Sequence, residues 1–259
     1  MTVRAPSGRA PRTLQPWVLS VSVVLLTALF FQLAVGRVLD PLWFARPTDV
    51  LALLAQWLTG GFIYPHIATT LTEIAIGFGL GVGVAIVLAV VLSSSALLAR
   101  ITMPLVVAAN SLPKVALIPF FIFTLGVGIE SKVVQVALNV IFIVFLNLYA
   151  GLTTINPRLR ESLALMGASP FEILVKVKLP ASLAWLLSGM RISARYALAG
   201  AVAVELLSSN RGLGFLIAKA TAQLEPAQLF ATLVVLAVMG FAITYALQVL
   251  ENRVLAWRI

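Results

Sequence analysis

Six apolar segments, each long enough for a helix to cross a bilayer, recur along the chain and limit what it can fold into. They cover residues 17–35, 67–92, 101–125, 133–152, 184–207 and 227–250. Charged residues make up only 10% of the sequence, against about 25% in a typical soluble domain. The chain is therefore predicted to be an all-α integral membrane protein with six transmembrane helices.

The cations between these segments predict their orientation, because cytosolic segments carry an excess of Lys and Arg. If both termini are inside, ten cations lie on inner segments and five on outer ones. The inner cations are Arg4, Arg9, Arg12, Arg100, Arg158, Arg160, Lys176, Lys178, Arg253 and Arg258, and the outer ones are Arg37, Arg46, Lys132, Arg211 and Lys219. We therefore predict cytosolic termini, a disordered cytosolic tail over residues 1–16 and a transmembrane domain over residues 17–259.

Residues 17–35 allow a second interpretation, a cleaved signal peptide, because a basic segment precedes them. The run is longer than the apolar core of a typical signal peptide, and it lacks a convincing small-x-small cleavage site. A retained first span is therefore the favoured interpretation.

Several classes of site are disfavoured by composition. The sequence has no cysteine and a single histidine, His66, so a metal site or a Ser–His–Asp triad is not expected. No Gly-x-x-x-x-Gly-Lys-Ser/Thr sequence occurs, so the chain is not expected to hydrolyse ATP. The net charge of +9 is explained by inner loops and anionic lipid rather than by nucleic acid.

Residues 156–180 form a polar, basic island between the fourth and fifth spans. Asn156 can cap a first short helix, and Gly167 is placed to end it, since glycine adopts the left-handed conformation without steric cost. Ser169 and Glu172 have the spacing of a capping box, which predicts the start of a second short helix. This inner loop is expected to hold a shape for contact with a partner.

Small and polar residues inside the spans predict how the helices pack. The second span carries four glycines at alternate positions, Gly77, Gly79, Gly81 and Gly83. They form two overlapping Gly-xxx-Gly pairs on adjacent faces, suited to close packing around a pathway or at a dimer seam, and equally to ordinary packing within the membrane. Asn139 and Asn147 of the fourth span are predicted to hydrogen-bond across to neighbouring helices.

Polar residues interrupt two further spans and are candidates for a translocation pathway. Asn110 and Lys114 flank a break in the third span, and broken backbone persists in a bilayer only where protein buries it or it lines a water-filled cavity. Arg191 and Arg195 lie one turn apart on the fifth span, with Glu205 further along. The alternatives are a break at the inner surface, an Arg191 that reaches that surface, and an Arg195 paired with a buried acid or carbonyl.

The inner loop resembles the EAA loop of ABC importer permeases. That signature is Glu-Ala-Ala, three residues, Gly, nine residues, then Ile-x-Leu-Pro. Glu161, Gly167 and Val177-Lys178-Leu179-Pro180 match its spacing throughout, although Ser and Leu replace the two alanines and Val replaces the isoleucine.

The resemblance covers about residues 65–258 and is greatest to the nitrate, sulfonate and taurine branch of these permeases. It includes Ala116-Leu117-Ile118-Pro119 with Leu125-Gly126-Val127-Gly128, Gly189-Met190-Arg191, and Glu205 followed by Gly212-Leu213-Gly214. The resemblance implies a multi-pass protein of the bacterial inner (plasma) membrane, with the MetI-like permease fold.

The resemblance also implies a role for the loop, which in this family docks as a coupling helix in a groove on a cytosolic ATPase. The residues expected to couple to the ATPase are Glu161, Ala164, Leu165, Gly167, Ala168 and Ser169. Glu161, Ala164, Leu165 and Ala168 fall at i, i+3, i+4 and i+7, which predicts a small, partly apolar helical face.

The resemblance implies an assembly of two permeases, expected to be a homodimer, with two ATPases and a periplasmic or lipid-anchored solute-binding protein. ATP and Mg would bind the ATPase, so this chain, in contact with membrane lipid, is expected to bind no cofactor and no metal.

The predicted function is the membrane-spanning subunit of an ATP-driven importer for a small anionic solute such as nitrate, a sulfonate or taurine. Alternatives are the same machinery for a vitamin precursor or aromatic acid, a stand-alone secondary transporter, and a scaffold subunit. A secondary transporter needs coupling carboxylates or inverted repeats. Only Glu73 and Glu205 are candidates, each near a span end, and no repeat is obvious.

Overall fold

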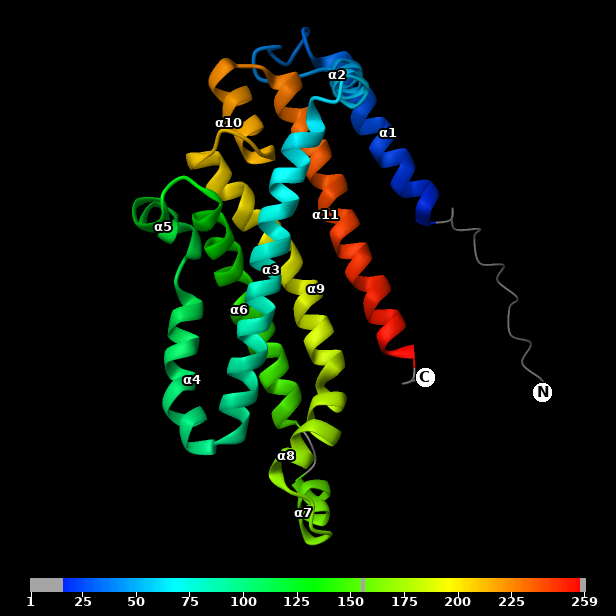
Figure 1. Cartoon of the computed structure of the whole chain (residues 1–259). Helices are drawn as coiled ribbons and strands as arrows, with labels where there is room; N and C mark the ends of the chain where they lie inside the picture. Colours follow the sequence, from blue (N-terminus) through cyan, green and yellow to red (C-terminus); the bar gives the residue numbers. More distant parts are fainter. Residues whose placement is uncertain (1–15, 155–156, 257–259) are drawn as a thin grey trace, which may run out of the picture.

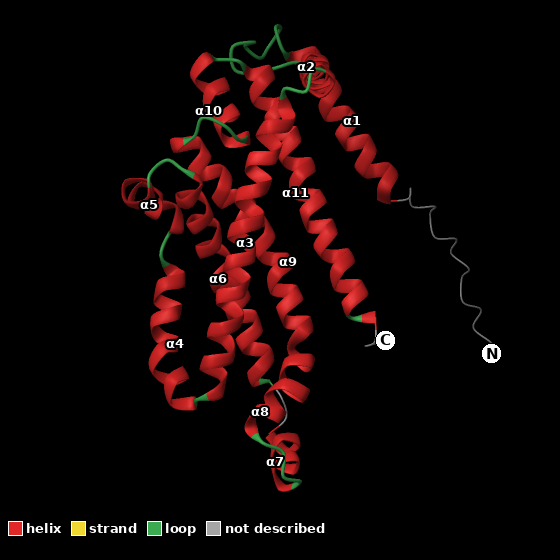
Figure 2. Ribbon diagram, viewed as in Figure 1, coloured by secondary structure: helices red, strands yellow, loops and turns green. Residues whose placement is uncertain are grey.

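A computed structural model describes residues 16–154 and 157–256, and helices account for most of them (Figure 1). In chain order the elements are α1 (Pro16–Ala34), α2 (Pro47–Thr59), α3 (Ile63–Ser94), α4 (Ala96–Ser111), η1 (Lys114–Leu117), α5 (Ile118–Leu125), α6 (Ile129–Thr153), α7 (Pro157–Leu165), α8 (Pro170–Ile173), η2 (Leu174–Lys178), α9 (Leu179–Ser208), α10 (Leu213–Gln223) and α11 (Pro226–Val254). Loops join them, and no strand is drawn in the described part (Figure 2). Residues 1–15 of the predicted tail lie outside the described residues.

Four helical units in the described part are long and apolar enough to cross a membrane: α3, α6, the continuous unit Pro170–Ser208 and α11. A fifth span results if α4 and the η1–α5 segment count as one helix, which is bent by 83° at its break. The first apolar helix, Val18–Ala34, is shorter. The all-helical membrane fold is confirmed, while six spans with cytosolic termini stay a prediction.

Three long helices, α3, α6 and α9, lie side by side and form the core of the bundle (Figure 1). α6 supplies the large buried side chains Val136, Val140, Val144 and Leu148. The facing helices supply small buried residues, among them Gly77, Gly81, Ala85 and Ala89 of α3 and Ala194, Ala197 and Ala201 of α9. Small residues let membrane helices approach closely, so van der Waals contact holds this trio together.

The other helices cover the trio on two sides. α11 packs on α9, and α2 crosses the end of α11 that lies near α10 (Figure 1). α4 returns along α3 and α5 lies against α6 on the opposite side of the bundle. α7 and α8 project at the end remote from α2 and α10. The two ends of the molecule are thus built differently.

The four glycines of α3 divide into one packed pair and one open pair. A Cβ at Gly77 would lie 2.6 Å from Val136 Cβ, and one at Gly81 would lie 2.8 Å from Val140 Cβ. Gly79 and Gly83 have no such neighbour within 4 Å among the described residues. Within this chain, the close approach of α3 to α6 uses Gly77 and Gly81.

The two asparagines of α6 behave differently. Asn139 Nδ2 donates to the Tyr196 carbonyl of α9 at 3.2 Å, as predicted. Asn147 Nδ2 donates to Ile143 O of its own helix at 2.8 Å, so the prediction of a bond across helices is wrong there. The α9 backbone comes close at Gly189, where an added Cβ would lie 3.0 Å from Asn147 Cβ. Where α9 comes this close, the side-chain amide of Asn147 bonds to its own helix, α6, and not to α9.

Candidate functional site

The inner loop turns sharply between α7 and α8. Gly167 has φ +88°, the left-handed region that glycine adopts without a Cβ penalty. Ala168 N donates to Leu163 O at 3.0 Å, which is the long bond of a Schellman helix end. The predicted helical face is therefore interrupted, because α7 ends at Leu165 and Ala168 lies beyond the turn.

The second short helix begins with the capping box predicted from its sequence. Glu172 N donates to Ser169 Oγ at 3.2 Å, and Ser169 N donates to Glu172 Oε2 at 3.0 Å. Lys176 Nζ lies 2.9 Å from Glu172 Oε1. Because the reciprocal bonds satisfy donors at the helix start, the direction of α8 is fixed relative to the turn.

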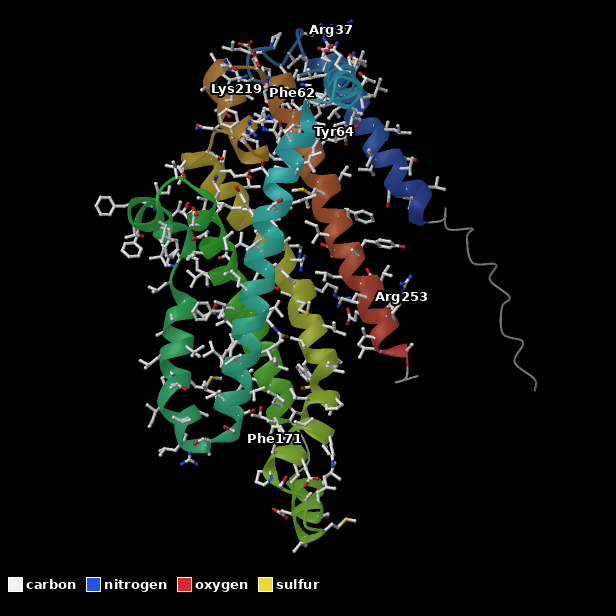
Figure 3. All side chains as sticks on the ribbon, in the orientation of Figure 1. Arg37, Phe62, Tyr64, Phe171, Lys219 and Arg253 are labelled. Carbon is white, nitrogen blue, oxygen red and sulfur yellow. The ribbon has the colours of Figure 1, made fainter. Side chains whose placement is uncertain are left out.

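The tip of this loop exposes apolar side chains. Leu165 is 90% exposed, Met166 83% and Phe171 72%, and Phe171 is labelled beside α8 in Figure 3. Glu161, Gly167 and Ser169 are also exposed at the tip, while the side chain of Ala164 lies outside the described part. Isolated exposed apolar residues are ordinary, but a group on a capped turn is typical of an interaction site.

A cavity lies behind the tip, against the nearby end of α3. Its volume is about 520 Å³. It is lined by Ser93, Ser94, Ala168, Pro170, Phe171, Ile173, Leu174 and Lys178. Ala168 thus lines a space between α8 and the end of α3.

The break between α4 and α5 brings Asn110 and Lys114 together. Lys114 Nζ donates to Asn110 O at 3.0 Å and to Asn110 Oδ1 at 3.1 Å, and it lies 5.0 Å from the centroid of the Phe142 ring. Gln135 Nε2 of α6 donates to Lys114 O at 3.2 Å. These bonds satisfy carbonyls that the broken helix leaves free, as a membrane requires of irregular backbone.

The two arginines of α9 have different surroundings. Arg191 Nη1 lies 3.2 Å from Glu251 Oε2 of α11. Arg195 is exposed, and no partner for it is found in residues 16–154 and 157–256. The alternative that Arg195 pairs with a buried acid or carbonyl is therefore wrong for the described part of the chain. The ion pair with an acid is made by Arg191, and it is only partly buried.

Glu205 lies apart from these arginines, in a buried polar cluster near α10. Its Oε1 accepts from Thr70 Oγ1 at 2.7 Å, and its Oε2 accepts from Gly214 N at 2.6 Å. Lys132 Nζ lies 3.3 Å from Glu73 Oε1 in the same cluster. Sequence reasoning did not group these residues, although charged residues at span ends were a usable signal.

Comparison with known proteins gives one family. The model for "Binding-protein-dependent transport system inner membrane component" matches residues 77–256. The formylaminopyrimidine transport permease protein ThiX of Halalkalibacterium halodurans is 30% identical over 201 residues, covering 78% of this chain and 80% of ThiX. The taurine transport system permease protein TauC of Escherichia coli is 27% identical over 242 residues, covering 91% of this chain and 88% of TauC.

A solved structure shares the fold. One chain from inward-facing conformations of the MetNI methionine ABC transporter aligns with a TM-score of 0.61 at 22% identity. The alignment covers 77% of this chain and 97% of that chain. The part of this chain left unaligned makes it longer than the shared permease core.

Proposed function

The chain belongs to the family of binding-protein-dependent transport system inner membrane components, and on that premise we propose that it forms the pathway of an importer and receives energy through residues 156–180. It is a multi-pass inner-membrane protein and a permease subunit of the ABC importer type. The solute, the partner proteins and the coupling residues are our proposals.

The observation that carries the coupling proposal is the apolar tip at Leu165, Met166 and Phe171. α7 and α8 are short, and the polar residues Glu161, Ser169 and Glu172 lie beside these apolar side chains, so the tip is not a purely apolar, lipid-facing surface. An apolar helix end with a fixed turn fits a groove on another protein. The cytosolic ATPase is the partner whose groove would receive it, with Glu161, Gly167, Ala168 and Ser169 shaping the turn.

ATP and Mg would bind to that ATPase, because this sequence has no phosphate-binding loop. Closure of two ATPases would push the tips of two permeases. The open face of α3 at Gly79 and Gly83 is suited to a helix of a second copy, which supports a homodimer. A solute-binding protein would deliver the solute at the end that carries α2 and α10.

The proposed solute is a small anion such as taurine, an alkane sulfonate or nitrate. Arg195 supports this choice, because it is a cation on a core helix that no described acid neutralises. Asn110 and Lys114 would add polar groups at the break of the third span. A formylaminopyrimidine-like vitamin precursor is the second candidate, favoured by the named function of ThiX.

The coupling proposal is tested by Leu165→Asp, with Val38→Asp as a matched control. Both side chains are apolar and at least 85% exposed, but Val38 lies in the link between α1 and α2. Leu165→Asp is expected to lose the co-expressed ATPase on purification, since a central interface residue contributes about 2 kcal/mol or more, roughly 30-fold in affinity. Equal retention of the ATPase by both variants would exclude the tip as the coupling element.

The solute is tested by uptake into vesicles that contain the whole importer and its solute-binding protein. Competition by taurine, alkane sulfonates, nitrate and formylaminopyrimidine ranks the candidates. Uptake that persists without the ATPase would instead support a stand-alone transporter.

A further inference from the structure

Two carboxyl groups and one ammonium group are buried together where four helices meet. Glu73 of α3 and Glu205 of α9 are each 1% exposed, and Lys132 of α6 is 6% exposed. The start of α10 lies over them, since Gly214 N reaches Glu205. Burying a charge costs several kcal/mol unless a partner neutralises it, so the charges in this cluster must balance.

Glu205 has the contacts of an ionised carboxylate. Each of its oxygens accepts a hydrogen bond, one from the Thr70 hydroxyl at 2.7 Å and one from Gly214 N at 2.6 Å. Gly214 lies in the first turn of α10, where backbone N–H groups and the helix dipole favour a negative charge. Thr70 Oγ1 also accepts from Leu213 N at 3.0 Å, so α3, α9 and α10 are joined at this carboxylate.

The contacts of Glu73 would not satisfy an ionised carboxylate. Its Oε1 lies 3.3 Å from Lys132 Nζ. Its Oε2 is buried, and no donor reaches it in the described part of the chain. Glu73 follows Thr70 by three residues on α3, so the two side chains share a face, and Thr70 contacts Glu205. Two carboxylates can only accept hydrogen bonds, so Glu73 and Glu205 can bond to each other only when one of them carries a proton.

We propose that Glu73 carries a proton and donates it to Glu205, so that the cluster is a buried binding site for one proton. Neutral Glu73, anionic Glu205 and cationic Lys132 then sum to zero. Without the proton the cluster holds one uncompensated negative charge. A bound sodium ion would also balance the charge, but Lys132 Nζ already lies beside Glu73 Oε1 and would repel it.

The surrounding charged groups do not supply this balance. Lys132 faces Glu73 from α6, and Glu205 faces it from α9. On α3, His66 lies nearer the outer end, where its Nδ1 accepts from Gly212 N at 3.2 Å. Arg211, just before α10, and Lys219, within α10, are exposed, and their positive charges act on the His66 ring.

The proton site links protonation to the position of α10. The first turn of α10 is held by Glu205 and Thr70, and separation of α10 from α3 and α9 would bring water to Glu73. Ionisation of Glu73 then follows, because an exposed glutamate is ionised above about pH 4.3. Closing of α10 therefore takes up one proton, whichever solute and ATPase the importer uses.

Glu73→Gln tests the proposal, since the amide is neutral and keeps the shape of a protonated carboxyl. Opening of the wild-type cluster releases a proton, so its stability should fall as pH rises from about 5 to about 9, by up to tenfold in the opening constant per pH unit. Thermal unfolding of the full chain in detergent, measured across that range, gives the slope. We expect Glu73→Gln to reduce the slope, and Glu130→Gln, at an exposed glutamate, to leave it unchanged.

An unchanged slope in Glu73→Gln would overturn the proposal. If sodium stabilises the protein more than choline does at constant ionic strength, the site binds a sodium ion and not a proton, and the proposal is overturned. Infrared spectroscopy of the wild type needs no folded variant: with ¹³C-labelled glutamate at neutral pH, we expect the C=O band of a protonated carboxylic acid. Absence of that band would show that Glu73 is ionised.

Discussion

The two ends of the bundle differ in the side chains that they bury and expose: one end buries ionisable groups, and the other exposes apolar ones. Near α10, the side chains of Glu73, Lys132 and Glu205 are buried, and their partners lie within the chain. At the inner tip, the apolar side chains Leu165 and Met166 are exposed, and nothing in the described part covers them. The first arrangement holds the fold together, and the second leaves a surface for another molecule.

The difference teaches which substitutions affect stability and which affect assembly. A residue whose partners lie in its own chain contributes to folding, so its loss should lower the unfolding temperature. A residue whose partner is another protein should leave that temperature unchanged. Stability and ATPase retention, measured together, therefore separate the two ends of the molecule.

The largest expected effect is that of Lys132→Met. In the described part of the chain, Lys132 is the only cation buried with Glu73 and Glu205. Removing one partner of a buried ion pair costs about 3–5 kcal/mol, because Glu205 keeps a charge that nothing balances. The measurement is thermal or chemical unfolding of the purified chain. Lys219→Met, an exposed lysine of α10, is the control and should change stability by less than about 0.5 kcal/mol.

A second substitution on the Lys132→Met background identifies the ionised acid. Glu205→Gln should recover part of the lost stability, since the amide oxygen can still accept from Thr70 or Gly214. Glu73→Gln should recover little, because Glu73 is already neutral. Recovery by Glu73→Gln alone would reverse the assignment of the two acids.

Gly167→Val should have the next largest effect, and it acts at the other end of the molecule. A β-branched residue at φ +88° is strained by about 1–2 kcal/mol, so the turn between α7 and α8 would change shape. We expect reduced ATPase retention and uptake with an unchanged unfolding temperature of the bundle. Gly167→Asn, which tolerates the left-handed region, is the control and should retain more activity.

Ser169→Ala should weaken the start of α8 without affecting the core. Loss of a helix cap costs about 1 kcal/mol, so the amide of Glu172 should exchange with solvent about fivefold faster. Hydrogen exchange measured by mass spectrometry over residues 166–176 checks this. Ser169→Asp keeps a capping oxygen, and exchange as fast as in Ser169→Ala would argue against the capping box.

The smallest stability effect is expected for Arg191→Gln, between the two ends. The Arg191 side chain is 40% exposed, and ion pairs of this kind contribute less than about 1 kcal/mol. Arg195→Gln should change stability equally little but reduce uptake of an anionic solute. Equal loss of uptake in both variants would indicate that the ion pair of Arg191 with Glu251 opens during transport.

Local signals in the sequence predicted local structure well. The capping box at Ser169 and the turn at Gly167 both occur as predicted. Each depends on residues within a few positions of one another, so backbone sterics and nearby hydrogen bonds decide it. The same holds for the break near Lys114, where the helix is bent by 83°.

Contacts between distant residues could not be predicted in the same way. Two glycine pairs were equivalent in sequence, yet only the pair at Gly77 packs on α6. Asn139 and Asn147 looked alike, yet one bonds to α9 and the other to its own helix. Helical spacing places residues on a face, but the rotation of the helix in the bundle decides what that face meets.

The sequence by itself determined that this chain is a helical membrane protein with a capped loop that turns at Gly167. Apolar length, caps and turn residues are properties of short segments, and they act before any helix meets another. Only the tertiary structure decided that Glu73, Lys132 and Glu205 form one cluster and that Arg191 pairs with Glu251. Those contacts join residues on different helices, and a buried charge finds its partner only after the helices have packed.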